Sequence, residues 1–272
     1  MLNITELAKW VEEAEFLFLI TVAIVEVAID LVCHNKRNYR DTRANIAIAI
    51  VCSITAATLG YAIALAELEF FSQFKLMEIP IDGWTLILAV AIADFIYYWE
   101  HRTEHQIRFF WAYHNVHHSS TDYNYTVASR LSWVETWFLW IFYIPMVLLG
   151  FDPLLVFLAV QINTAYQTWI HTQKIARLGI LERVINTPAL HRVHHASNPG
   201  YIDKNFGGIL MIWDRLFGTY QAERETPIYG LTENINTNNP IKINGIEYQR
   251  IGRDMFESKS WKEIWQSIFG SP

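Results

Sequence analysis

Histidines dominate the chemistry that this sequence can support. Nine of its ten histidines lie in four places: HRTEH at 101–105, HNVHH at 114–118, WIHTQ around position 171, and HRVHH at 191–195. Residues three or four apart share one face of a helix, so each cluster is expected to project its imidazoles together. The candidate metal ligands are His101, His105, His114, His117, His118, His171, His191, His194 and His195.

The ligand type restricts the metal. Neutral imidazole suits iron, zinc, copper or nickel, and nine nitrogens exceed what one ion accepts, so two ions are expected. Cys33 and Cys52 lie in apolar stretches and are expected to be small buried hydrophobes rather than ligands. Packing alone does not explain a repeated His-x-x-His-His, because burying many ionisable rings is unfavourable without a cation. A lone histidine such as His34 is expected to have no metal role.

Four polar residues are candidates to hold the ligand histidines in place without contacting the metal themselves. Asp94 lies two helical turns before His101, where a carboxylate could accept the distal N–H of a ligand imidazole or pair with an arginine. Glu104, Asn163 and Asn205 are the other candidates, because polar groups beside a histidine-rich pocket usually find a partner there.

Composition favours a membrane protein. The chain has 272 residues, of which 52% are hydrophobic and eleven are tryptophan. Apolar segments at 15–33, 45–66 and 83–99 approach the ~20 residues that cross a bilayer, and 133–170 resembles a hairpin with a turn at 150–153. We expect an all-α integral membrane protein with about four to five membrane helices, the last two a hairpin that crosses fully or only part way. Glu26 and Asp30 should face protein rather than lipid.

Charge predicts the orientation and excludes one class of partner. The short loop after the first span carries Lys36, Arg37, Arg40 and Arg43, which places it in the cytosol. The N-terminus then lies on the opposite side, and the histidine clusters and the C-terminus are cytosolic, with residues 171–272 forming a histidine-rich helical cap. The net charge of −6 argues against a nucleic-acid partner.

The motifs match a known family. HRTEH, FFWAYHNVHHSSTDYNYTVASR at 109–130, YQTWIHT at 166–172 and TPALHRVHHASNPGYIDKNFGGILMIWDRLFGTY at 187–220 resemble the fatty acid hydroxylase superfamily, also called the sterol desaturase family. The segment PIYGLTENINTNNP at 227–240 is similar to the alkylglycerol monooxygenase branch, but has Glu233-Asn234 where that branch has His-Pro. The resemblance implies one membrane domain over 1–272, with anchor spans in 1–100, a catalytic core in 101–220 and a cytosolic tail in 221–272.

The resemblance also implies an activity. Members of this family oxidise carbon–hydrogen bonds of sterols, fatty acyl chains, sphingoid lipids or ether lipids, so it implies that the nine histidines hold two irons, which zinc can replace during purification. It implies a monooxygenase whose partners are a lipid substrate and the bilayer. The segment with Asn198, Asp203, Asn205 and Gly207-Gly208 resembles the family's tail to the third cluster, where we expect a structural turn.

Electrons must come from outside the chain. The sequence has no Rossmann glycine pattern, no haem segment and no cysteine cluster, so a separate electron-donor protein or a reductant such as a pterin is expected.

Two other functions compete with this interpretation. A metal transporter would place ligands at mid-span and show inverted repeats, whereas these clusters lie beyond the span ends and no repeat is visible. The second alternative is a non-catalytic scaffold, in which bound metal only stabilises the cap. Intact ligands in every cluster argue against it.

Overall fold

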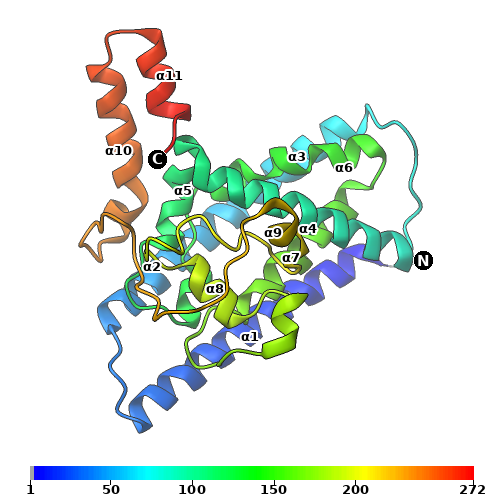
Figure 1. Cartoon of the computed structure of the whole chain (residues 1–272). Helices are drawn as coiled ribbons and strands as arrows, with labels where there is room; N and C mark the ends of the chain where they lie inside the picture. Colours follow the sequence, from blue (N-terminus) through cyan, green and yellow to red (C-terminus); the bar gives the residue numbers. More distant parts are fainter. Residues whose placement is uncertain (1–2) are drawn as a thin grey trace.

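The computed structural model describes residues 3–272. Over this range the regular elements are helices, joined by loops that form two isolated β-bridges. Figure 1 shows long helices packed beside a loop-rich region that carries α8 and α9. The helices of this packed body include α1 (Ile4–Val32), α2 (Tyr39–Thr55), α3 (Tyr61–Ser72), α4 (Gly83–Gln106), α5 (Arg108–His118) and α7 (Pro153–Thr168). The all-helical expectation is therefore confirmed.

A single helical stretch, Tyr39–Ser72, contains the expected span 45–66. It consists of α2, the π-helical turn η1 (Ala56–Gly60) and α3. Among the described residues it is the one helix long and apolar enough to cross a membrane, judged by length and composition. A π turn inside such a helix shifts the faces of its two halves relative to each other.

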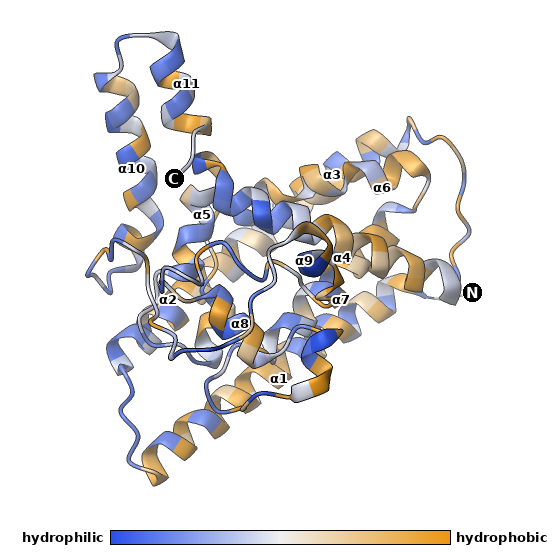
Figure 2. Cartoon of the chain, in the orientation of Figure 1, coloured by the Kyte–Doolittle hydropathy of each residue, from blue (hydrophilic) through white to orange (hydrophobic). Residues whose placement is uncertain are grey.

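The other long helices combine apolar surfaces with buried acids. On α1, Phe16 and Ile24 are exposed, and on α4 Trp84 and Ile87 are exposed; much of both helices is apolar in Figure 2.

The two acids within the expected first span are buried. Glu26 and Asp30 lie 3.3 and 2.9 Å from Nη1 of Arg37, and Asp30 also contacts Lys174. The prediction that these acids face protein is confirmed, and their partners come from the chain that follows α1 and from the segment after α7.

The hairpin predicted at 133–170 is present but its arms are short. The first arm is broken into η3 (Glu135–Trp137), η4 (Leu139–Tyr143) and α6 (Ile144–Leu149), and the second arm is α7. Both arms are shorter than the ~20 residues of a crossing helix. At the turn, Gly150 has φ +117°, and a Cβ there would lie 2.2 Å from the Met77 carbonyl oxygen, so the position requires glycine.

Helices α1, α3, α4, α6 and α7 share one apolar core. Ala64, Leu68, Ala89, Ala93 and Leu155 are fully buried where they meet. Because small residues dominate α3 and α4 at these contacts, the helices approach closely, and the C-terminal end of α4 is fixed beside that of α7.

The rest of the chain covers the ends of these helices. It contains η5 (Gly179–Arg183), α8 (Pro188–His194) and α9 (Ile212–Phe217), followed by α10 (Pro240–Glu257) and α11 (Trp261–Phe269). In Figure 1, α10 and α11 form a hairpin that projects from the body beside α5. Arg108, at the start of α5, joins it through Glu247 at 2.9 Å and Asp254 at 2.7 Å.

The two cysteines have different surroundings. Cys52 is buried, as expected, but Cys33 is exposed. The expectation for Cys33 was wrong because it caps the C-terminal end of α1, beyond the helix face that packs on the protein.

Candidate metal centre

Four elements deliver the nine histidines to one place. His101 and His105 lie on the last turns of α4, and α5 carries three more histidines. The cluster at 191–195 lies on α8 and its C-cap, and His171 follows the end of α7. The helical placement predicted from the spacing is therefore confirmed for all three clusters.

The nine side chains divide into two groups. The first group contains His101, His105, His114, His118 and His194, and the second contains His117, His171, His191 and His195; within each group the nearest ring nitrogens all lie within 4.8 Å of one another. Residues four apart share a group, whereas the intervening histidine of α5 or α8 joins the other group. Each of these two helices therefore contributes to both groups. His34, in the turn after α1, belongs to neither.

Distances within each group match a coordination sphere. In the first group, Nε2 of His114 lies 3.1 Å from Nε2 of both His101 and His118. In the second group, Nε2 of His171 lies 3.1 Å from that of His117 and 3.0 Å from that of His191. Imidazoles bound to one ion at ~2.1 Å would have nitrogens roughly 3.0–3.4 Å apart.

Backbone carbonyls determine which nitrogen can bind a metal. Nδ1 of His101 and His194 donates to the carbonyls of Phe206 and Lys204, at 3.0 and 2.9 Å. Nδ1 of His171 donates to the Gln167 carbonyl at 2.8 Å. A carbonyl only accepts, so the proton is on Nδ1 and the lone pair is on Nε2.

In the pair formed by His117 and His171, this placement of the protons brings two lone pairs face to face. Nδ1 of His117 donates to the Arg130 carbonyl at 3.3 Å, so both rings of the pair carry their lone pair on Nε2. These two atoms face each other at 3.1 Å and neither can donate a proton to the other. A cation between them removes this repulsion, and the residues present therefore fit bound metal ions.

Burial keeps the ligands neutral. It lowers the pKa of His105, His114 and His194 to about 3 and that of His171 to about 4. The imidazoles are therefore unprotonated at neutral pH, as metal binding requires.

Glu104 lies where the sequence suggested, beside a ligand. Its Oε2 is 2.9 Å from Nδ1 of His114. The carboxyl is buried, which raises its pKa to about 8.

Asp94 and Asn163 support the site in a different way from the one expected. Asp94 accepts hydrogen bonds from Asn163 at 2.8 Å, from the Trp213 indole at 2.8 Å, and from the backbone of residues 209 and 210. The expected bond from an imidazole to Asp94 is replaced by these contacts, because groups of α7, α9 and the loop before α9 occupy both carboxylate oxygens. Asn163 in turn accepts from Gln167, whose carbonyl holds His171.

Asn205 supports α8 through the backbone. It adopts φ +58°, and its side chain bonds the Leu190 carbonyl at 2.9 Å and both backbone groups of Gln221. Leu190 directly precedes His191, so Asn205 fixes the helix rather than an imidazole ring. Nearby, Oδ1 of Asp203 lies 3.5 Å from Nδ1 of His105.

The glycines of the same segment permit close approach. A Cβ on Gly208 would lie 2.5 Å from Oδ1 of Asn163. Asp214 accepts from the amides of Phe206 and Gly207 at 2.8 Å each, which fixes the carbonyl that receives the His101 proton. These contacts agree with the interpretation of the segment as a structural turn.

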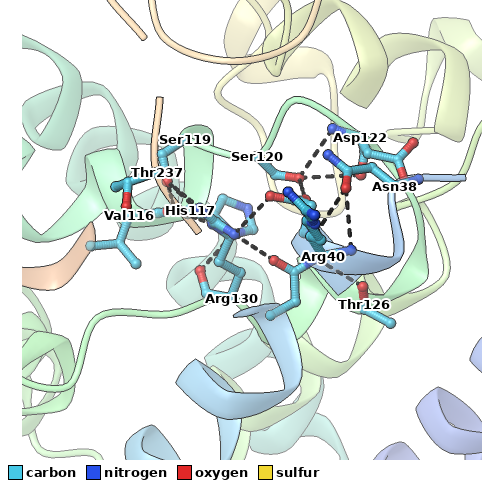
Figure 3. Close-up of polar contacts among 12 residues, drawn as sticks. Asn38, Arg40, Val116, His117, Ser119, Ser120, Asp122, Thr126, Arg130 and Thr237 are labelled. Carbon is cyan, nitrogen blue, oxygen red and sulfur yellow. Dashed lines mark hydrogen bonds and ion pairs between the residues drawn. The ribbon is translucent and has the colours of Figure 1, made fainter. Parts of the chain in front are cut away.

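Arg130 is a supporting residue that the sequence did not single out. Arg130 is completely buried and donates to the Val116 carbonyl at 2.9 Å and the Ser119 hydroxyl at 2.8 Å. Figure 3 shows it beside these residues and His117. The same guanidinium reaches Asn45 at 2.6 Å and Asp41 at 3.3 Å on α2. It therefore ties α5 to α2, and its own carbonyl holds His117. The available signal was an arginine inside an otherwise weakly charged stretch.

A cavity of about 350 Å³ reaches both groups of histidines. At its inner end lie His114 from the first group and His117 and His171 from the second. Its walls come mainly from α7 and the segment 128–143, with further residues from α1, α2, α3 and α4. They include Leu19, Ala49, Tyr61, Trp140, Phe157 and Val160. Glu12 and Ser53 line it and are also exposed, so the cavity opens between α1 and α2.

Comparisons with known proteins agree with a metal centre formed by the clustered histidines. Residues 86–219 match the model of the fatty acid hydroxylase family, a membrane-associated family. The chain is 37% identical over 243 residues to an alkylglycerol monooxygenase of Xenopus tropicalis (89% of this chain, 54% of that protein) and 38% identical over 229 residues to that of Homo sapiens (83% and 51%). It is 31% identical over 181 residues to an ornithine lipid hydroxylase of Rhizobium tropici (66% and 54%).

These relatives are all named as oxidoreductases. The chain spans about half the length of each of them. No solved structure matches the chain. The matched range begins on α4, ends after α9 and contains all nine clustered histidines, and residues 86–219 of this chain therefore belong to the fatty acid hydroxylase family.

Proposed function

We propose that the protein is an oxygen-dependent monooxygenase that hydroxylates a carbon–hydrogen bond of a lipid at a pair of irons held by the nine histidines. The cavity is the observation that carries this proposal, because it reaches ligands of both groups. Structural metal sites are closed by protein ligands, whereas catalytic sites keep a position open to substrate.

Each part of the chain has a defined task in this reaction. Two ferrous ions, when bound, supply the activation of oxygen that an unactivated carbon–hydrogen bond requires. The Nε2 atoms hold the ions, and the carbonyls of Phe206, Arg130, Gln167 and Lys204 fix the rings. Apolar walls such as Phe157 and Val160 bind an alkyl chain and exclude water from the reacting carbon.

An ether lipid of glycerol is the first substrate to test. Relatives that cover 89% and 83% of this chain are named alkylglycerol monooxygenase. Relatives named for ornithine lipid hydroxylation and sterol desaturation make those two lipid classes the next candidates.

We further propose a multi-pass arrangement with four to five membrane segments. The exposed apolar faces of α1 and α4, and the inward position of Glu26 and Asp30, support spans in addition to Tyr39–Ser72. In this arrangement residues 1–100 anchor the chain, 101–220 form the catalytic core and 221–272 form the tail. The histidine clusters and the C-terminus are cytosolic, and the N-terminus is on the opposite side.

The electrons are proposed to come from an external donor, either a carrier protein or a reduced pterin. The sequence motifs for a bound flavin, haem or iron–sulfur cluster are missing from the chain, which supports a separate donor.

Oxygen consumption separates this proposal from its two alternatives. Protein purified without oxygen and loaded with ferrous iron should consume oxygen when given a 1-O-alkylglycerol and a reduced pterin or a reductase mixture. Metal flux into liposomes without oxygen uptake would instead support a transporter. Tight zinc binding with neither oxygen uptake nor flux would support a metal-stapled scaffold.

A further inference from the structure

A second concave site lies on the surface between η5 and α9. It has a volume of about 680 Å³ and is lined by Arg177, Gly179, Ile180, Glu182, Arg183, Arg215 and Tyr220. None of these residues is a candidate metal ligand. Three guanidinium groups and one carboxylate leave two positive charges in the pocket, although the chain as a whole carries −6.

Arg215 is held in place without losing its charge. It donates to the carbonyls of Arg183 and Glu182 at 3.2 Å each, and its guanidinium lies 3.7 Å over the ring of Tyr220. Neutral carbonyls and an aromatic ring orient a cation but do not neutralise it.

The other two arginines differ in their partners. Arg177 lies 3.3 Å from the buried Glu182. Arg183 is exposed, and its side chain makes no ion pair among residues 3–272. The pocket therefore presents one free guanidinium beside two that are already positioned.

An apolar rim surrounds these charges. Ile180, Leu181 and Val184 on and beside η5, and Ile212 and Leu216 on α9, are all exposed; Ile180 is 73% exposed. Five large aliphatic side chains around a cationic pocket are typical of a surface that meets lipid.

This rim continues onto the apolar face of α4. On α9, Trp213 packs against Phe95 with ring centroids 4.9 Å apart, and Phe217 packs against Trp99 at 4.8 Å. Phe95 and Trp99 are themselves partly exposed near the end of the segment proposed to span the membrane. Tryptophan is favoured at the headgroup level, so α9 and the pocket lie at that level.

We infer that the pocket between η5 and α9 binds the anionic phosphate headgroup of a membrane lipid, with the rim of η5 and α9 in contact with the acyl chains. Guanidinium groups recognise phosphate through paired hydrogen bonds, and basic residues near an anionic membrane surface are attracted to it. The site is separate from the histidine centre, so it does not depend on which reaction that centre performs.

Native mass spectrometry of the full chain in a neutral detergent tests this inference. The probes are dioleoyl phosphatidylglycerol, dioleoyl phosphatidylcholine and inorganic phosphate. We expect one phosphatidylglycerol to bind at least fivefold more tightly than phosphatidylcholine. Arg183→Ser should weaken phosphatidylglycerol binding about fivefold, the equivalent of ~1 kcal/mol. Arg253→Ser, which removes an exposed arginine of α10, should leave it unchanged.

Each other outcome overturns the inference. Equal binding of the two lipids, or unchanged binding by Arg183→Ser, would show that the arginines recognise no anionic headgroup. If inorganic phosphate displaced the lipid at equal concentration, the pocket would be a site for the free ion instead. The melting temperature of Arg183→Ser should equal that of the unaltered protein. If it does not, Arg183→Gln gives the same test, because glutamine is uncharged but keeps more of the arginine side chain than serine does.

Discussion

At four of the nine clustered histidines a backbone carbonyl determines which ring nitrogen faces the proposed metal site. Carbonyls of residues 130, 167, 204 and 206 accept the Nδ1 protons of four rings, which directs their Nε2 lone pairs to the inside of the site. Such supporting contacts typically change metal affinity 10- to 100-fold when they are lost. The affinity of the centre therefore depends on loop geometry as well as on the histidines.

Replacing one ligand in each group tests the division into two sites. We predict that His194→Ala, in the first group, and His117→Ala, in the second, each lower bound iron from about two ions per chain toward about one, because only one coordination shell is opened. Elemental analysis by mass spectrometry after anaerobic purification measures this. His34→Ala is the control and should retain both ions. If either ligand variant kept its full iron content, the assignment of that histidine would be wrong.

Arg130 offers a second test at the scale of single residues. Lysine keeps the charge but has a single nitrogen, which cannot reach Val116, Ser119 and Asn45 at once. We predict that Arg130→Lys lowers the free energy of unfolding by about 2 kcal/mol and also lowers iron affinity through the His117 contact. Denaturant unfolding and metal titration measure the two effects. Unchanged values, equal to those of the surface control Arg253→Lys, would contradict this role.

Much of the site could be predicted at the scale of single residues. The gathering of the nine histidines in one place follows from their type and helical spacing. The count of two ions stays a prediction, which the division of the histidines into two groups supports. Which ion each histidine joins could not be predicted, because His114 and His117 share a helix face and only the packing of α4, α7 and α8 separates them. The role of Asp94 was missed for a similar reason, since its partners lie 69 to 119 positions away in the sequence.

At the scale of elements, the π turn η1 lies within the helical stretch Tyr39–Ser72, which forms part of the cavity wall. It places Gly60 against η3, where a Cβ would lie 2.4 Å from Oγ1 of Thr136. The sequence predicted a regular helix over 45–66, because a π turn has no distinctive composition. The short 3-10 turns of the hairpin were also not predicted, since hydropathy does not distinguish them from α-helix.

This close contact provides a double-mutant test. We predict that Gly60→Ala lowers the free energy of unfolding by about 1–3 kcal/mol, because the new methyl group overlaps the Thr136 side chain. Thr136→Ala alone should cost little, since its hydroxyl has no hydrogen-bond partner in the described structure. Combined with Gly60→Ala it should restore part of the lost stability, because the overlap with Oγ1 is removed while the Cβ of residue 136, 2.9 Å from the new methyl group, remains. Thermal unfolding of the four proteins checks this. An additive loss in the double mutant would show that the overlap is not the cause.

At the scale of the whole molecule, the cavity, the metal centre and the apolar surfaces form one path. The cavity opens between α1 and α2 and ends at the histidines, and both helices are apolar on their outer sides. In the proposed arrangement a lipid substrate would enter the cavity from the side without leaving the bilayer. The family and the general function could be predicted from motifs, whereas the extent of each span depends on where lipid meets the structure.

Cysteine labelling tests the proposed sidedness. The exposed Cys33 is first replaced by alanine, and a cysteine is placed at Lys259 in the turn between α10 and α11, or at Lys75 before α4. We predict that a membrane-impermeant maleimide applied to intact cells labels the cysteine at 75 and not the one at 259, because the basic loop after α1 is cytosolic. The reverse pattern would show that the orientation is inverted.

The source of the inserted oxygen tests whether the histidine centre carries out an oxygen-dependent hydroxylation. The iron-loaded protein is given a 1-O-alkylglycerol and reduced pterin under ¹⁸O₂, and the product is reduced with borohydride at once, so that a carbonyl cannot exchange its oxygen with water. We predict a product that carries one ¹⁸O atom from ¹⁸O₂ and none from H₂¹⁸O, and no product from His117→Ala. A product labelled from water, or equal product from that variant, would contradict oxygen-dependent hydroxylation at the histidine centre.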